Sequence, residues 1–395
     1  MSAAVVGAAG GTAFERAAAV VDRRFDEMVE ELRACARIAS VSAEASPGLE
    51  EMSAWLAERL EQLGFSVESV PVPGHAPVVI GRLPGAGPRR LLLYSHYDVQ
   101  PAEPRSAWSR DPFAAELEGG VVYARGIVDD KADVASRLHA LRAWQESSGE
   151  LPFEVVWLSE GAEEIGSPGL ETVCREHAST LRADGCLWES YLRRADGTPE
   201  IAFGCKGLLY LQLRVRLLAA DQHSSFAPVF RSAPVRLVQA LATLVAEDGR
   251  PAVDGLAATF DPPGEPELEQ LEALELPDDS AARLEGASPF FDAGRLELLE
   301  RLLYEPSINL SGLSAGFQGA GSKTVLPADA SAKVDIRLVP GQSPAVVAAL
   351  VRAHLDRRGF GDVSLEVVSS VEGARSSPAS AVGAAVIRAA RDVLG

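Results

Sequence analysis

The first half of the chain alternates between segments of helical and of strand-like hydrophobic spacing. Apolar residues recur every three to four positions in residues 17–36 and 49–63, with charged residues between them, which predicts two amphipathic helices. Further helices are predicted at 131–144 and 168–177, and strands at 65–72, 78–83, 90–94, 154–158 and 186–188. Strands that alternate with helices predict a mixed, mostly parallel sheet with helices on both faces.

The hydrophobic pattern changes after Gly207. The predicted elements are, in order, a strand at 208–218, a helix at 232–246, strands at 308–313 and 331–339, a helix at 344–357 and a strand at 363–371. Strand, helix, two strands, helix, strand is the split βαβ, ferredoxin-like order of a small α+β domain. We therefore expect a second domain at 207–375, inserted into a first domain of residues 1–206 plus 376–395.

Composition narrows the class of protein. The length of 395 residues predicts two domains. With 47% hydrophobic and 24% charged residues, the composition is typical of globular proteins. Its formal net charge of -19 argues against a nucleic-acid partner, which would need clustered Lys and Arg. The four cysteines form no CxxC pair, which fits a reducing compartment. No run has the roughly 18 apolar residues of a membrane helix, and residues 1–12 lack the basic region of a signal peptide. We expect a cytoplasmic protein without a membrane partner.

A histidine and an aspartate follow the apolar strand at 90–94. His96 and Asp98 are two residues apart, so in an extended segment their side chains point to the same side. Asp98 can then accept a hydrogen bond from one ring nitrogen of His96 while the other nitrogen faces a metal ion. Taken alone, such a pair at a strand end is more often structural.

Asp129 and Asp130 stand just before the predicted helix at 131–144. Aspartate is a preferred helix N-cap and favours the positive end of the helix dipole, which accounts for one of the two residues. A metal ion would account for the other. Glu189 follows the strand at 186–188 and, taken singly, is more often a surface residue.

A pair of glutamates follows the strand at 154–158. Adjacent buried carboxylates such as Glu163 and Glu164 repel each other and are disfavoured without a cation. One of them can bind a divalent ion while its neighbour takes a proton from bound water, a division that metal-dependent hydrolysis requires. On a solvent-exposed loop the same pair would have no catalytic or metal-binding role.

Together these segments resemble a known enzyme family. The matching motifs are His96-Tyr97-Asp98-Val99-Gln100-Pro101, Trp108, Asp111-Pro112-Phe113, Tyr123-Ala124-Arg125-Gly126 and Asp129-Asp130-Lys131. They are similar to those of the dinuclear-zinc metallopeptidases, a family that includes aminoacylases, desuccinylases, glutamate carboxypeptidases and carnosinase-like dipeptidases. The dipeptidase branch is the most similar, and the resemblance extends over almost the whole chain.

The resemblance implies roles for the residues of the first domain, which would be the catalytic domain. His96 and Glu189 would bind the first Zn²⁺ ion, and Asp129 would bridge it to a second ion bound by Glu164, with Mn²⁺ or Co²⁺ as alternatives. Asp98 would orient His96, and Glu163 would be the general base. The peptide bond between Asp129 and Asp130 is often cis in such enzymes.

The resemblance also implies that the second domain is a lid through which the protein forms a homodimer. His223, in Asp221-Gln222-His223-Ser224-Ser225, would stabilise the oxyanion of the tetrahedral intermediate. Arg337 would bind the C-terminal carboxylate of the substrate, a task suited to a planar bidentate donor. Asn309 would add a polar contact near the scissile group.

One family feature has no counterpart in this sequence. The family's catalytic domain normally continues after the lid and supplies a late histidine to the second zinc site, but no histidine follows His354 here. We expect a second site that is incomplete, through truncation, frameshift or natural loss. The leading interpretation is a zinc-dependent hydrolase of dipeptides or short peptides. The alternatives are an N-acyl or N-carbamoyl amino acid amidohydrolase and a catalytically impaired dimerising or binding homologue.

Overall fold

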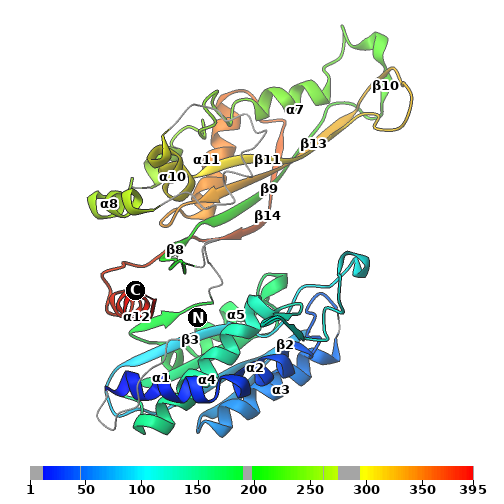
Figure 1. The fold of residues 1–395 in the computed structure, drawn as a ribbon. Helices are drawn as coiled ribbons and strands as arrows, with labels where there is room; N and C mark the ends of the chain where they lie inside the picture. Colours follow the sequence, from blue (N-terminus) through cyan, green and yellow to red (C-terminus); the bar gives the residue numbers. More distant parts are fainter. Residues whose placement is uncertain (1–11, 45, 190–197, 261, 275–293, 395) are drawn as a thin grey trace. The chain divides into compact units, whose positions relative to one another are not determined.

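A computed structural model of the protein describes residues 12–44, 46–189, 198–260, 262–274 and 294–394. The chain forms two compact units. Unit 1 comprises Met1–Leu192 and Ala384–Gly395, and unit 2 comprises Arg193–Gly383. The elements of both units carry the labels of Figure 1.

Unit 1 contains a mixed sheet of five strands. They are β1 (Ser66–Val72), β2 (His75–Leu83), β3 (Arg90–His96), β6 (Glu154–Glu160) and β7 (Gly185–Leu187), in the order β1-β2-β6-β3-β7. β3 is parallel to both β6 and β7, whereas β2 is antiparallel to both β1 and β6. Only β2 therefore runs against the other four strands, which confirms the predicted mixed, mostly parallel sheet. A separate two-stranded ribbon is formed by β4 (Glu116–Glu118) and β5 (Val121–Tyr123).

Helices cover both faces of this sheet (Figure 1). They are α1 (Ala13–Arg23), α2 (Phe25–Ala36), α3 (Pro47–Gln62), α4 (Ala132–Ser148), α5 (Leu170–Glu176) and α6 (Ala178–Leu181). On one face, α2, α3 and α4 pack against a core that contains Leu93, Val155 and Trp157. On the other face, Val173 of α5 and Leu181 of α6 join a second core with strand residues.

The local sequence explains how these helices begin and end. The Ser46 hydroxyl accepts a hydrogen bond from the Gly48 N–H and Pro47 occupies the first turn of α3, both common at helix N-termini. The single helix predicted over 17–36 is wrong, because the structure has two helices that meet at Arg24. The backbone of Arg24 leaves the helical region, with φ -105° and ψ 14°, and its side chain pairs with Glu27 and Glu146.

Unit 2 is built on a four-stranded antiparallel sheet. Its strands are β9 (Gly207–Arg216), β11 (Ser307–Ala315), β13 (Asp329–Leu338) and β14 (Ser364–Val371), in the order β11-β13-β9-β14. Helices α7 (Ala233–Leu241) and α11 (Pro344–Arg357) contribute to the core beside these strands. Alternate residues of β9 are buried, as expected for a sheet with one covered face. The predicted order of strand, helix, two strands, helix, strand is confirmed.

Shorter elements complete the described part of the chain. They are β8 (Gly204–Cys205), β10 (Gln222–His223), α8 (Glu265–Ala273), α10 (Arg295–Tyr304), β12 (Val325–Leu326), β15 (Ala374–Arg375) and α12 (Ala381–Leu394). β10 pairs with β12, and β8 pairs with β15. Among the described residues, none of the helices combines the length and the apolar character that crossing a bilayer requires.

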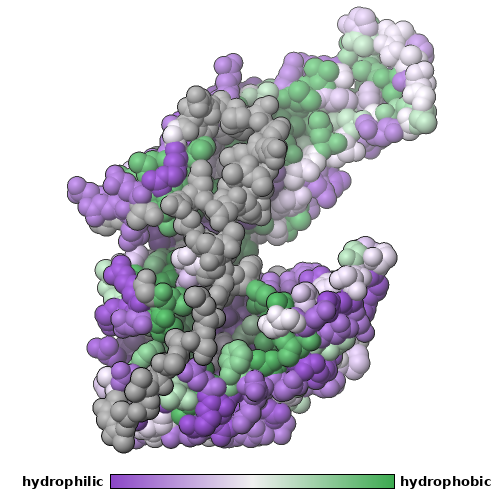
Figure 2. All heavy atoms as spheres, in the orientation of Figure 1, coloured by the Kyte–Doolittle hydropathy of each residue, from purple (hydrophilic) through white to green (hydrophobic). Residues whose placement is uncertain are grey.

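The surface of unit 2 is unevenly polar. On the face shown in Figure 2, apolar residues gather over the end of the unit that carries α7 and β10. Exposed apolar side chains there are Phe226, Val229, Phe230, Val235 and Val238. Clusters of exposed apolar side chains are uncommon on monomeric proteins and often mark interaction surfaces.

Candidate metal centre

Three strands of unit 1 end side by side and bring predicted site residues to one edge of the sheet. β3 ends at His96 and β6 ends at Glu160, and these two residues are direct partners in the parallel register. β7 pairs with the opposite side of β3, and Glu189 follows two residues after its end. Ligands of such sheets gather at the carboxyl ends of the strands, which makes this edge the candidate site.

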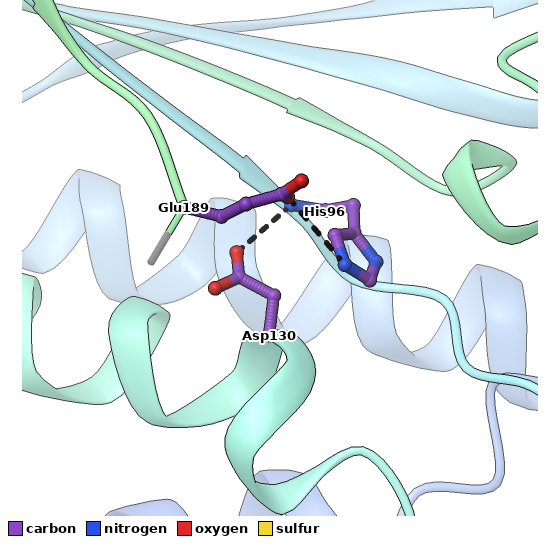
Figure 3. A group of neighbouring side chains, drawn as sticks. All are labelled: His96, Asp130 and Glu189. Atoms are coloured by element: carbon purple, nitrogen blue, oxygen red, sulfur yellow. Dashed lines mark hydrogen bonds and ion pairs between the residues drawn. The ribbon is translucent and has the colours of Figure 1, made fainter. Parts of the chain in front are cut away.

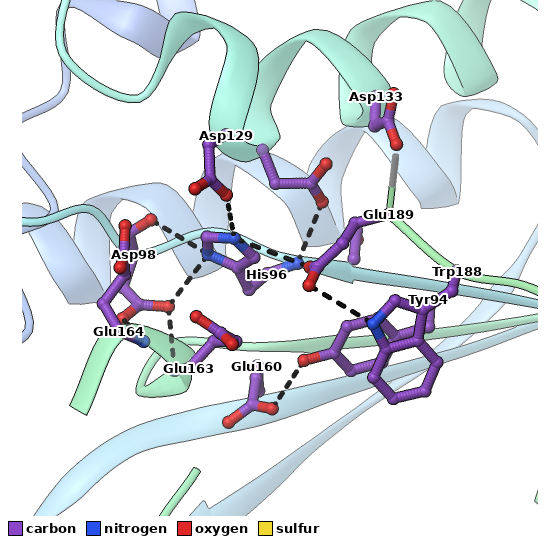
Figure 4. A network of polar contacts seen from close by, with 12 residues as sticks. Tyr94, His96, Asp98, Asp129, Asp133, Glu160, Glu163, Glu164, Trp188 and Glu189 are labelled. Atoms are coloured by element: carbon purple, nitrogen blue, oxygen red, sulfur yellow. Dashed lines mark hydrogen bonds and ion pairs between the residues drawn. The ribbon is translucent and has the colours of Figure 1, made fainter. Parts of the chain in front are cut away.

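His96 is fully buried and lies between carboxylates (Figure 4). Its Nε2 atom lies 2.8 Å from Asp129 Oδ1 and 3.6 Å from Glu189 Oε2. Its Nδ1 atom lies 3.1 Å from the carbonyl oxygen of Asp98 and 3.3 Å from Oδ1 of the same residue. Burial opposes protonation, but the contacts with Asp129 and Asp98 outweigh it and raise the pKa of His96 to about 11. The surroundings of this ring therefore favour positive charge.

Two carboxylates each have one oxygen that accepts a hydrogen bond and a second oxygen that accepts none from the described residues. Asp130 Oδ2 accepts from the His96 backbone N–H at 3.1 Å, and Glu189 Oε1 accepts from the Trp188 indole N–H at 3.2 Å. Asp130 Oδ1 and Glu189 Oε2 are buried and have no hydrogen-bond partner among the described residues. One ligand atom from each of His96, Asp130 and Glu189 lies within 4.8 Å of the others (Figure 3).

The chemistry of this cluster fits a divalent metal ion. Burial raises the pKa of Asp130 to about 8 and that of Glu189 to about 7. A bound metal cation would stabilise the ionised form of both carboxylates. Imidazole nitrogen and carboxylate oxygen are ligands that zinc accepts. Two buried carboxylate oxygens that accept no hydrogen bond from the described residues, beside a histidine ring, fit a site for a divalent cation.

Asp98 links the histidine to the pair of glutamates. Its Oδ1 atom accepts from the Glu163 N–H and its Oδ2 atom from the Glu164 N–H, both at 3.1 Å. The same carboxylate contacts His96 Nδ1, the contact expected from the sequence. Glu163 is half-buried, and burial raises the pKa of its carboxyl. Glu164 lies outside the three-residue cluster, and its Oε2 atom accepts from Gln100 Nε2 at 2.9 Å.

Two tight backbone turns present these carboxylates. Gly126 has φ +72° and begins the turn Ile127–Lys131, and a Cβ atom there would lie 2.2 Å from Val99 Cγ1. Only glycine fits, because both the left-handed backbone and the close approach exclude a side chain. A Cβ atom at Gly161, in the turn that leads to Glu163, would lie 2.3 Å from Tyr97. The peptide bond between Asp129 and Asp130 is cis.

A buried lysine holds the first of these turns against α2. Lys131 is completely buried, and its Nζ donates to the carbonyl oxygens of Cys35 at 3.0 Å and Ile38 at 2.6 Å. Burial lowers the pKa of Lys131 to about 8. Cys35 lies in the last turn of α2 and Ile38 follows two residues after its end, where the partial negative charge of the helix C-terminus favours a cation.

Four residues of this network lie outside the set that the sequence predicts. The sequence allows two roles for Asp130, a helix N-cap or a metal ligand. It indicates no role for Tyr94, Glu160 or Trp188. The Tyr94 hydroxyl donates to Glu160 Oε1 at 2.7 Å, and its ring stacks on Trp188 (Figure 4). Glu160 could have been found from its place at the end of a strand parallel to that of His96. Nothing in the local sequence indicates the contact between Tyr94 and Trp188.

The remaining candidates lie in unit 2. His223 is exposed at the end of β10, and its Nδ1 lies 2.9 Å from the Ser225 hydroxyl oxygen. Asn309 and Asp335 face each other on β11 and β13, and Asn309 Nδ2 donates to Asp335 Oδ1 at 2.9 Å. Arg337 is exposed near the end of β13. Their proposed roles in catalysis and substrate binding stay predictions.

The chain is similar in sequence and in fold to known peptidases. A model described as Peptidase family M20/M25/M40 matches residues 92–395. The Cys-Gly metallodipeptidase dug1 of Schizosaccharomyces pombe is 29% identical over 361 residues, which cover 86% of this chain and 74% of that protein. The Beta-Ala-His dipeptidase of Rattus norvegicus is 28% identical over 379 residues, 89% of this chain and 76% of that protein. The structure of the M20 family metallo-carboxypeptidase Sso-CP2 from Sulfolobus solfataricus has a TM-score of 0.83 at 34% identity, covering 93% of this chain and 84% of that one.

Proposed function

The chain belongs to peptidase family M20/M25/M40, and we propose that it hydrolyses the peptide bond of dipeptides or short peptides with Glu163 as general base. The family resemblance predicted from the sequence motifs is confirmed, and the chain is a metallopeptidase of dipeptidase-like type. The observation that carries the proposal is a pair of buried carboxylate oxygens beside His96, Asp130 Oδ1 and Glu189 Oε2, that accept no hydrogen bond from any described residue.

The metal is proposed to be Zn²⁺, with Mn²⁺ or Co²⁺ as alternatives. His96, Asp129 and Glu189 would hold the first ion, as the resemblance implies. Asp130 is a further candidate, because its Oδ1 atom has no hydrogen-bond partner among the described residues. Asp129 and Glu164 would hold a second ion. When bound, a divalent ion supplies a Lewis acid for the scissile carbonyl and lowers the pKa of a bound water molecule.

The protein's own groups handle the protons. Glu163 lies on the turn held by Asp98, and its raised pKa brings its carboxyl closer to the value that suits a general base. It would take the proton of the attacking water molecule and deliver it to the leaving amine. Asp98 acts as a positioning residue, because its carboxylate contacts both His96 and the Glu163 N–H.

Residues of unit 2 complete the proposal. His223 would donate a hydrogen bond to the oxyanion, Arg337 would bind the substrate carboxylate, and Asn309 would contact the region of the scissile group. The exposed apolar residues of α7 and its neighbourhood, among them Val235 and Val238, support a homodimer formed through unit 2, the proposed lid. A cytoplasmic location remains part of the proposal.

A substrate panel tests the activity. Protein loaded with Zn²⁺ or Mn²⁺ is incubated with free-amine dipeptides and with N-acyl and N-carbamoyl amino acids, and product amines are quantified. We expect cleavage of dipeptides by the wild type and none by His96→Ala. Preferential cleavage of the acylated compounds would replace the dipeptidase assignment with an amidohydrolase. A stable dimer that binds less than one metal ion per chain and cleaves nothing would contradict the assignment as an enzyme altogether.

A further inference from the structure

The two oxygens of Glu189 have different environments. Oε1 accepts from the Trp188 indole N–H at 3.2 Å, whereas Oε2 is buried, has no hydrogen-bond partner among the residues that the structure describes, and lies 3.6 Å from His96 Nε2. A carboxylate on a side chain with several rotatable bonds can turn either oxygen, or neither, toward a metal ion. The indole N–H selects one orientation, in which Oε2 faces the histidine ring (Figure 4).

The indole is itself held in place by its neighbours. Its ring stacks on Tyr94, with 3.7 Å between ring centroids and an interplanar angle of 13°. Tyr94 is buried at 1% exposure, and its hydroxyl donates to Glu160 Oε1, which also accepts from the Ser167 hydroxyl at 2.8 Å. The stack therefore rests on a side chain that is fixed at both its ring and its hydroxyl.

One guanidinium ties the backbones of the two stacked residues together. Arg137 on α4 donates to the carbonyl oxygen of Trp188 at 2.6 Å and to that of Tyr94. Its Nη2 atom also lies 2.9 Å from Asp133 Oδ2. The segment that carries Glu189 is thus anchored to β3 and α4 immediately before the carboxylate.

Packing alone does not explain a tryptophan here. Trp188 is 56% exposed, so most of its surface contributes little to the core. A phenylalanine would stack on Tyr94 as well, and the property that distinguishes tryptophan is its N–H donor. Groups that orient a metal ligand in this way commonly tune metal affinity.

We propose that Trp188 is a positioning residue for metal binding, whose indole N–H, held by the stack on Tyr94, orients Glu189 so that Oε2 faces the metal site. The inference rests on the proposed function, because it takes Glu189 to be a metal ligand. It adds that the residue before this ligand determines metal affinity.

The test compares metal affinities of purified full-length variants by competition with a chromophoric chelator, using Zn²⁺ and Mn²⁺ alone as probes. Trp188→Phe keeps an aromatic ring for the stack and removes the donor, and we expect its dissociation constant to rise on the order of 10-fold. Trp55→Phe is the matched control, because Trp55 lies on α3 and contacts Arg59. Its affinity should equal that of the wild type.

A double-mutant cycle separates positioning from general support of the fold. If the indole acts through the carboxylate, Trp188→Phe should weaken binding in the wild-type background and have no further effect in the Glu189→Gln background. If the fold-changes in dissociation constant of the two single variants multiply in the double variant, the two residues act independently and the proposal is overturned. A wild-type dissociation constant in Trp188→Phe would also overturn it.

Two further outcomes are distinguishable. If the wild type binds neither ion, the proposed function and this inference both fail, whereas failure of Trp188→Phe to change the affinity removes the inference alone. Should Trp188→Phe not fold, the indole N–H signals of ¹⁵N-tryptophan-labelled wild type are followed instead. We then expect metal addition to shift one indole signal strongly, and no shift in any of them would overturn the proposal.

Discussion

At the scale of single residues, the site depends on how each carboxylate divides its two oxygens. Asp98 accepts hydrogen bonds with both oxygens from backbone N–H groups of the glutamate turn, which agrees with its proposed role as a positioning residue. Asp130 and Glu189 each accept a hydrogen bond with one oxygen, and the other oxygen of each accepts none in the described part of the chain. The types and spacing of these residues are visible in the sequence. The choice of oxygen depends on which donors the fold brings near.

Replacing Glu163 by glutamine tests the assignment of the general base. Glutamine keeps the shape of the side chain but cannot accept a proton, so kcat should fall on the order of 10²- to 10⁴-fold. Metal affinity should be unchanged, because Asp98 binds the backbone of residue 163 and not its side chain. Steady-state kinetics and chelator competition measure the two quantities.

Glu171→Gln serves as the control for this substitution. Glu171 lies on α5, where its side chain is 79% exposed and pairs with Arg175. It should retain wild-type kcat and metal affinity. Comparable activity of Glu163→Gln and the wild type would remove Glu163 from the mechanism.

At the scale of elements, strand pairing and tight turns place the site. β3 lies between β6 and β7 in parallel register, so His96, Glu160 and the segment before Glu189 come to one edge. The strands themselves follow from hydrophobic spacing. Their order in the sheet does not, because any of several orders would bury the same apolar residues.

Gly126→Ala tests the turn that carries Asp129 and Asp130. The left-handed backbone costs alanine roughly 1–2 kcal/mol, and the overlap with Val99 adds to it. Gly120→Ala is the matched control, since Gly120 has φ +81° but a Cβ atom there would meet nothing within 4 Å. Urea unfolding should show the larger destabilisation for Gly126→Ala, and only this variant should also bind metal more weakly. Equal effects of the two variants would show that the contact with Val99 is unimportant.

A buried histidine on α11 should make the stability of unit 2 depend on pH. His354 Nδ1 accepts from the Asp254 N–H at 3.2 Å, and Nε2 lies 3.0 Å from the Thr243 carbonyl oxygen, which fits the neutral ring. Burial and the Arg358 charge lower its pKa below the usual 6.5, although Asp254 opposes them. Protonation therefore favours the unfolded state. The contribution of the neutral His354 ring to the stability of unit 2 is fully present above pH 6.5 and is lost as the pH falls through the lowered pKa.

Urea unfolding at several pH values measures this effect. Between pH 7.5 and about 5, the wild type should lose more stability than His354→Gln, which cannot titrate in this range. His75→Gln is the control, because His75 is exposed on β2. It should follow the wild type. A His354→Gln profile parallel to that of the wild type would exclude His354 as the source.

At the scale of the whole molecule, the site residues span nearly a hundred positions of one compact unit. The proposed metal ligands come from β3, from the turn before α4 and from the segment after β7, and these parts come together only when unit 1 is folded. Metal binding must therefore be linked to the stability of this unit. The net charge of -19 strengthens this link between metal binding and stability, because bound cations reduce the repulsion between carboxylates.

Thermal unfolding with and without metal measures this linkage. Free Zn²⁺ at 100 times its dissociation constant should stabilise the folded protein by about 2.7 kcal/mol, and a chelator should reverse the gain. His96→Asn should show no metal-dependent shift, because the histidine is central to the cluster. An identical shift in this variant would place the stabilising ion elsewhere.

Motifs and hydrophobic spacing were enough to identify the family, the order of elements and the candidate set from His96 to Glu189. These features are local, since they depend on residue type and on separations of a few positions. Contacts between distant segments required the folded chain. They include the ion pair of Arg24 with Glu146 at the break between α1 and α2, the hydrogen bond from the His96 N–H to Asp130, and the stack of Trp188 on Tyr94. Each of these contacts depends on which strands pair and on which side chains compete for the same donors. A pattern of a few neighbouring residues cannot predict either.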